Sequence, residues 1–131
     1  MTTAIICTAI LAAMLLALGI NVTRLRAVTG KTGGSQFTTD PASGLFKAIR
    51  AHGNAAEYVP ALIVLFLLVG ARSPAAVAIP LIAGATVARL VHAYGLLSSP
   101  SLAAPTTSRL IGALGTYLFG IGLAVTAVLS L

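Results

Sequence analysis

The residues best suited to bind a charged ligand lie in one short stretch, residues 47–60. This stretch reads Lys-Ala-Ile-Arg-Ala-His-Gly-Asn-Ala-Ala-Glu-Tyr-Val-Pro. On a helix with about 100° per residue, its polar members fall within an arc of roughly 80°, and His52 points to the opposite side. The stripe consists of Lys47, Arg50, Asn54 and Glu57. A cation, an amide and a carboxylate on successive turns indicate a site for an anionic ligand.

Two further segments carry cations at a similar membrane depth. Arg89 and His92 are three residues apart, so they share one helix face. Arg109 opens the last apolar segment. Counting about 20 residues per span places Arg50, His92 and Arg109 near one membrane boundary. Glu57 then lies roughly 10 Å inside that boundary, at about 1.5 Å per residue. We therefore expect residues from three helices to gather in one membrane half.

Each of these residues also has a simpler interpretation. Arg50 and Arg109 could anchor helix ends by extending their guanidinium groups to lipid phosphates. Arg50 and Glu57 could form a structural ion pair that only sets helix register. The histidines and tyrosines could be interfacial side chains. The small residues Gly112, Thr116 and Gly120 are spaced for close helix packing rather than for chemistry.

The composition identifies the elements that must position these side chains. Of 131 residues, 58% are hydrophobic and 8% are charged, whereas a soluble domain carries about 25% charged residues. Ten charges cannot cover a water-exposed surface of this size, so a soluble protein is nearly excluded. The net charge of +6 does not indicate nucleic-acid binding, because apolar runs of membrane length separate the basic residues.

The hydropathy pattern predicts one all-α transmembrane domain spanning residues 1–131. Four apolar segments reach membrane length, and no strand pattern is present. The expected helices span residues of about 3–23, 44–70, 74–97 and 105–131. Basic residues concentrate in the loop after the first helix and around the third loop, so both loops are expected to be cytoplasmic. The single cysteine, Cys7, excludes an intramolecular disulfide and a cysteine-rich zinc site, and no metal is expected.

Residues 50–60 also resemble a known signature. The stretch Arg-Ala-His-Gly-Asn-Ala-Ala-Glu-Tyr-Val-Pro is similar to the Arg-Ala-His-x-Asn-x-x-Glu motif, followed by proline, of the MAPEG superfamily. These are the membrane-associated proteins of eicosanoid and glutathione metabolism, and they include microsomal glutathione transferases. Residues 89–95, Arg-Leu-Val-His-Ala-Tyr-Gly, resemble the third-helix motif of small bacterial members. The resemblance covers essentially the whole chain.

This resemblance implies a homotrimer of four-helix subunits in a bacterial inner membrane, with glutathione bound between neighbouring subunits near the cytoplasmic side. The implied ligand-binding residues are Arg50, Asn54, Glu57, Arg89, His92 and Tyr94. Arg50 would bind a carboxylate and Glu57 the ammonium group, while Arg109 would be the catalytic residue that stabilises the thiolate. A lipophilic electrophile would arrive from the bilayer.

The sequence departs from the catalytic relatives at three places. Gly53 stands where several of them have a second arginine. Leu96 stands where some have a tyrosine, because Tyr94 follows His92 by two residues instead of four. Thr107 and Ser108 compete with Arg109 for alignment with the arginine near the start of the fourth helix.

The leading hypothesis is a glutathione-dependent transferase or peroxidase-like enzyme that acts on lipophilic electrophiles. The alternative is a non-catalytic membrane protein that binds a lipid or a small thiol. A small transporter is a third candidate, but the intramembrane charges lie in one half and no inverted repeat is present.

Overall fold

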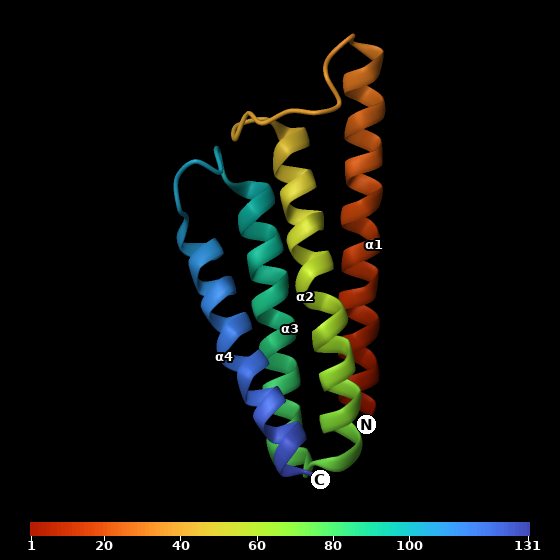
Figure 1. Cartoon of the computed structure of the whole chain (residues 1–131), viewed down its shortest axis with the longest axis vertical. Coiled ribbons are helices and arrows are strands. Elements are labelled where there is room, and N and C mark those ends of the chain that lie inside the picture. Colours follow the sequence, from red (N-terminus) through yellow and green to blue (C-terminus); the bar gives the residue numbers. More distant parts are fainter.

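The computed structural model describes residues 1–131 as an all-α fold of four helices, without a strand (Figure 1). The helices are α1 (Thr2–Lys31), α2 (Gly44–Arg72), α3 (Ala75–Ser98) and α4 (Thr107–Leu129). All four are long and apolar enough to cross a membrane. The expected fold class, a four-helix bundle of the integral membrane type, is confirmed.

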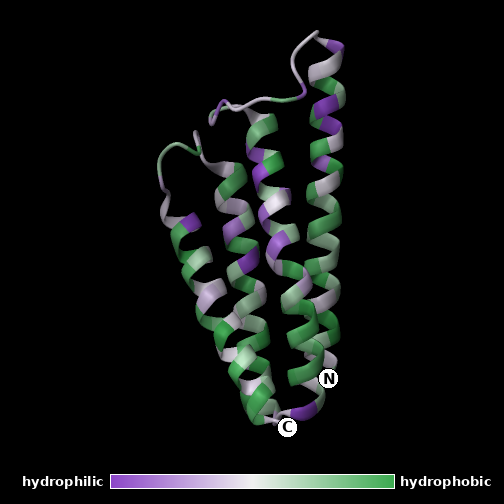
Figure 2. Ribbon diagram, in the orientation of Figure 1, coloured by the Kyte–Doolittle hydropathy of each residue, from purple (hydrophilic) through white to green (hydrophobic).

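The two ends of the bundle differ in what they hold (Figure 1). Residues 32–43 and 99–106 connect helices at one end, which we call the loop end. Both chain termini and the short α2–α3 turn lie at the other end, which we call the terminal end. Figure 2 shows that hydrophilic residues concentrate toward the loop end, with Arg72 alone among the arginines in the terminal turn.

The core is a seam of residues spaced three and four apart, the spacing that keeps one helix face toward its neighbours. On α2 the seam consists of Ala48, Ala51, Ala55, Val59, Leu62, Phe66 and Val69. Phe66 is fully buried, as are Leu11 of α1, Ile82 of α3 and Leu123 of α4. Because lipid tails are as apolar as these side chains, close van der Waals packing rather than transfer out of water holds this core together.

Helices α3 and α4 approach each other closely through glycines. A Cβ added to Gly112 would lie 2.5 Å from the backbone nitrogen of His92. A Cβ added to Gly95 would lie 2.8 Å from the backbone nitrogen of Arg109. Small residues of this kind let two backbones meet inside a membrane. The approach brings the functional groups of α3 and α4 into the same layer of the bundle.

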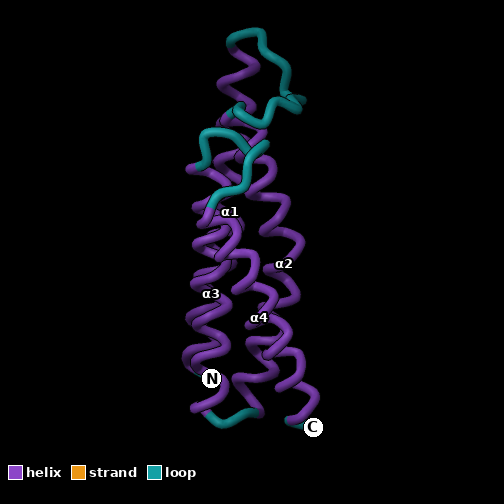
Figure 3. The backbone as a smooth tube through the Cα atoms, turned by 90° about the vertical axis from the view of Figure 1, so that its left-hand side faces the viewer, coloured by secondary structure: helices purple, strands orange, loops and turns teal.

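The helix bounds differ most from expectation in α1, which continues to Lys31 instead of ending near residue 23. Arg24, Arg26 and Lys31 are good helix formers, so the helix does not need to stop where the apolar run stops. It ends before Gly33, whose φ of 73° is the only positive φ in the chain. Figure 3 shows the loop that follows standing beyond the bundle at the loop end.

The starts of the other helices follow local chemistry. Ser43 is the residue before α2, and the Asp40 carboxylate accepts a hydrogen bond from the Ala42 N–H at 2.9 Å in the turn ahead of it. Pro74 stands at the N-cap of α3 rather than in its first turn. The helix α4 begins at Thr107 rather than near residue 105, and ends at Leu129.

Candidate functional site

A cavity of about 350 Å³ opens at the loop end between α2, α3 and α4. Four polar side chains from these three helices line it together with three apolar ones. The polar residues are Arg50, Asn54, His92 and Arg109, and the apolar residues are Phe46, Leu96 and Leu102. The arrangement offers two guanidinium groups, an amide and an imidazole to one ligand. Such a set of donors suits a small molecule that carries carboxylates.

Arg89 occupies a seam position of α3 that would ordinarily hold an apolar residue. Only 1% of it is exposed, and it is the largest fully buried side chain in the chain. Its Nη2 donates a hydrogen bond to Asn54 Oδ1 at 2.7 Å, and its Cζ lies 5.1 Å from the centre of the Tyr58 ring. Its Nε is buried without a hydrogen-bond partner. Arg89 therefore fixes the orientation of Asn54 from beneath the cavity.

Two tyrosines lie next to Arg89 and Asn54, on the side that faces α4. The hydroxyls of Tyr58 and Tyr117 lie 3.1 Å apart and share a hydrogen bond, and the ring centres are 6.0 Å apart. A small cavity of about 20 Å³ lies among Asn54, Tyr58, Arg89, Tyr117 and neighbouring residues. Asn54 and His92 line both this space and the larger cavity. The two spaces therefore form one polar layer, deepest at Arg89.

Arg109 and His92 are held by backbone groups. Arg109 Nη1 donates to the carbonyl of Ala104 at 2.7 Å and to that of Leu102 at 3.4 Å. His92 Nδ1 lies 2.9 Å from the Arg109 carbonyl oxygen. A carbonyl can only accept, so this contact requires the hydrogen to be on Nδ1. Both side chains stand at fixed places on the cavity wall.

Two predicted residues lie elsewhere on the surface. Glu57 is exposed away from the cavity, whereas Arg50, which is also exposed, is part of the cavity lining. Tyr94 is 67% exposed, and neither Glu57 nor Tyr94 lines the cavity. No hydrogen bond joins Arg50 to Glu57, and no group of three histidines, cysteines or acids could hold a metal ion.

Helix geometry explains how the predicted stripe divides. Arg50 and Glu57 lie at one edge of its arc of roughly 80° and are exposed. Asn54 and Lys47 lie at the other edge and are half-buried against neighbouring segments. Lys47 does not line the cavity, because its Nζ donates to the carbonyl of Ser99 at 3.0 Å instead.

Sequence reasoning missed part of the lining. Phe46, Leu96 and Leu102 carry no polar group, so nothing in their type marks them as cavity residues. The sequence allows an interfacial role for Tyr58 and Tyr117, whereas in the structure their hydroxyls share a hydrogen bond that joins residues 59 positions apart. A motif search along one helix cannot detect such a pair, although the position of Tyr58 beside the polar stripe was a usable signal.

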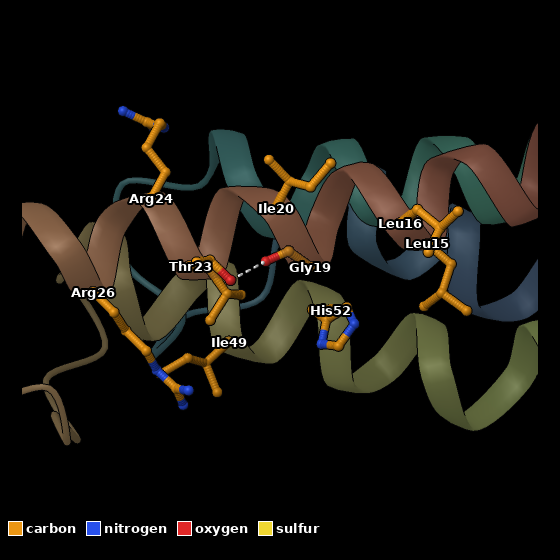
Figure 4. A pocket seen from close by; sticks show the side chains of 10 residues that line it. Leu15, Leu16, Gly19, Ile20, Thr23, Arg24, Arg26, Ile49 and His52 are labelled. Atoms are coloured by element: carbon orange, nitrogen blue, oxygen red, sulfur yellow. Dashed lines mark hydrogen bonds between the residues drawn. The ribbon is translucent and has the colours of Figure 1, made fainter.

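The opposite face of α2 borders a second and larger hollow. It is a groove of about 850 Å³ between α1 and α2. Its lining includes His52 of α2, whose ring stacks over Gly19 of α1 closely enough that an added Cβ would lie 3.3 Å from Nε2. Figure 4 shows Arg26 extending beside Ile49 while Arg24 extends to the other side of α1. As expected from its direction on the helix, His52 faces away from the cavity.

Residues 4–129 match the model of the MAPEG family, which is nearly the full length of the chain. The chain belongs to the MAPEG family. No curated protein and no solved structure matches it significantly. Membership supports a membrane protein of glutathione or eicosanoid metabolism, and associates the chain with glutathione and lipophilic substrates at the level of the family.

Proposed function

We propose that this protein is a glutathione-dependent transferase or peroxidase-like enzyme that acts on lipophilic electrophiles. The observation that carries the proposal is the single cavity that Arg50, Asn54, His92 and Arg109 line in a bundle of the MAPEG family. Glutathione has two carboxylates, an ammonium group and a thiol. The cavity supplies cations for the carboxylates and an amide that both donates and accepts.

Each side chain then has a distinct task. Arg50, exposed at the mouth, binds a carboxylate in bidentate fashion. Asn54, oriented by Arg89, bonds the peptide part of the ligand. The Arg109 guanidinium favours the thiolate over the thiol, with His92 beside it. The sulfur forms a bond to the electrophilic carbon of the lipophile, the bond from that carbon to its leaving group breaks, and the leaving group departs as an anion (chloride from an aryl chloride). The thiol proton passes to solvent.

The proposal includes an assembly and an orientation. Glu57 and Tyr94 are exposed in the single chain, and a neighbouring subunit of a homotrimer would cover them and complete the site. Glu57 would then accept from the glutathione ammonium group. The basic residues of the loop end favour a cytoplasmic position for both loops in a bacterial inner membrane.

The test is conjugation of glutathione to an aryl chloride by purified protein. Arg50→Ala and Arg109→Ala are each expected to lower kcat/KM by about ten- to a hundredfold, because a hydrogen bond to a charged group contributes about 1.5–3 kcal/mol. Arg72→Ala at the terminal end is the matched control and should leave kcat/KM unchanged. Conjugation that survives both loop-end substitutions would contradict the assignment.

A second candidate is a membrane protein that binds a lipid or a small thiol without turnover. Two observations favour it: Nη1 of Arg109 is already bonded to loop carbonyls, and Gly53 stands where several catalytic members of the family have an arginine. Glutathione-dependent thermal stabilisation without conjugation of any electrophile would establish this candidate and exclude the first.

A further inference from the structure

Lys47 joins α2 to the loop between α3 and α4. Its Nζ donates to the carbonyl of Ser99 at 3.0 Å, and Ser99 is only 3% exposed. Ser99 is the C-cap of α3, where carbonyls lack helical partners and a cation is favourable. This contact fixes the point at which the chain leaves α3. Lys47 lies outside the cavity lining, so it does not contact a ligand there.

The loop held by Lys47 has further attachments. The Leu102 N–H donates to the carbonyl of Pro41 in the first loop at 2.9 Å. The hydroxyls of Ser99 and Thr106 lie 3.3 Å apart. The two loops of the loop end are therefore tied to each other as well as to α2. These ties fix the backbone of residues 99–106 over the cavity, with the Leu102 side chain in its wall.

The same backbone segment holds Arg109. The carbonyls of Leu102 and Ala104 accept hydrogen bonds from its Nη1. An unrestrained arginine side chain has many rotamers, and binding a ligand would have to overcome the entropy of restricting them. Two carbonyls on a fixed loop remove part of that cost before the ligand arrives. The position of the loop thus decides where the Arg109 guanidinium stands.

We propose that Lys47 is a positioning residue for Arg109, and that it acts through the backbone of residues 99–106. The connection runs from the Lys47 ammonium to the Ser99 carbonyl, along the loop to the carbonyls of Leu102 and Ala104, and from these to the Arg109 guanidinium. The inference rests on the proposed function only where it concerns glutathione. The link between Lys47 and the loop stands apart from it.

The test is a double-mutant cycle read by glutathione titration of the full chain. Lys47→Met should raise the dissociation constant by about three- to tenfold, which is less than the loss of a direct hydrogen bond from a charged donor would give, because the effect reaches the ligand only through the loop. Against Arg109→Ala, which removes the guanidinium that the two carbonyls hold, the same change should cost less than about twofold. Lys47→Arg should restore most of the affinity. Lys31→Met, at the exposed end of α1, is the matched control and should have no effect.

Hydrogen exchange provides a second readout without glutathione. Lys47→Met should accelerate exchange of the Leu102 amide, because that amide bonds to Pro41 only while the loop is held. Unchanged exchange, or an equal loss of affinity in both Arg109 backgrounds, would overturn the inference. If the unaltered protein does not bind glutathione, the proposed function fails, and the Leu102 exchange rate alone decides whether Lys47 holds the loop.

Discussion

The loop-end and terminal-end halves of the bundle use the same helices differently. In the terminal half the seam holds Phe66, Ile82 and Leu123, all essentially inaccessible. In the loop-end half the corresponding layer holds Arg89 in α3, with the amide of Asn54 bonded to it. The first half is packed mainly with apolar groups, and its buried polar side-chain atoms are hydroxyls such as those of Thr8 and Ser73. The second contains polar groups whose hydrogen bonds must be satisfied inside a membrane.

The difference teaches where stability and function reside in so short a chain. Polar groups in a span are costly unless they face protein or a wet cavity, and here they gather around one cavity. The apolar half contributes the packing that compensates for them. Substitutions in the two halves should therefore have different effects. Those in the terminal half should change the free energy of unfolding, and those in the loop-end half should change ligand affinity.

The largest effect is expected from Phe66→Ala in the terminal half. Loss of a fully buried aromatic ring should lower the free energy of unfolding by about 3–5 kcal/mol. Denaturant titration in detergent micelles would measure it. Glutathione affinity of the remaining folded protein should be unchanged. An affinity loss as large as the stability loss would break the division between the halves.

Arg89→Met should have the opposite effect: a loss of ligand affinity without a loss of stability. Asn54 loses a charged hydrogen-bond partner, a contact of about 1.5–3 kcal/mol, so the dissociation constant for glutathione should rise by about ten- to a hundredfold. The melting temperature should hold or rise, because a buried cation is replaced by an apolar side chain. Arg72→Met is the control. Unfolding without an effect on affinity would show that Arg89 is purely structural.

Gly112→Ala should affect both stability and ligand affinity. The added methyl group would lie 2.5 Å from the backbone nitrogen of His92, so the helices must separate at a cost of about 1–3 kcal/mol. Both the unfolding free energy and glutathione affinity should fall, since His92 lines the cavity. Gly53→Ala, where an added Cβ meets nothing within 4 Å, should leave stability equal or higher. Equal results from both variants would contradict the close approach.

The smallest effect is expected from Tyr117→Phe. It removes one hydroxyl of the Tyr58–Tyr117 hydrogen bond, and half of Tyr117 is exposed. The unfolding free energy should fall by less than about 1 kcal/mol and the glutathione dissociation constant should change less than about threefold. Thermal melting and titration would detect it. A tenfold loss of affinity would make the Tyr117 hydroxyl part of the ligand site.

Much of the fold was predictable because apolar length and helix formation are local properties. The four helices and the grouping of both loops at one end follow from hydropathy and chain direction. The predicted end of α1, near residue 23, was wrong. The apolar run shows which residues lie in the bilayer, but the helix itself continues until a helix-breaking residue such as Gly33.

The site was predictable in part. Spacing on one helix and depth on three predicted a gathering of six residues: Arg50, Asn54, Glu57, Arg89, His92 and Arg109. The structure brings four of them together around one cavity, with Arg89 bonded to Asn54 beneath it and Glu57 exposed outside it. The sequence did not predict that Arg89 would be buried or that Lys47 would bond to Ser99. Those outcomes depend on rotation of α2 and α3 about their axes and on the path of a loop, which no single segment encodes.

The position of both termini at the terminal end has a practical consequence. Copies of the chain can be fused in series through short linkers without any linker having to cross the membrane. A covalent string of three copies with one altered copy would then report how many intact sites an assembly needs. The number of intact sites would then be set by the number of unaltered copies in a single polypeptide.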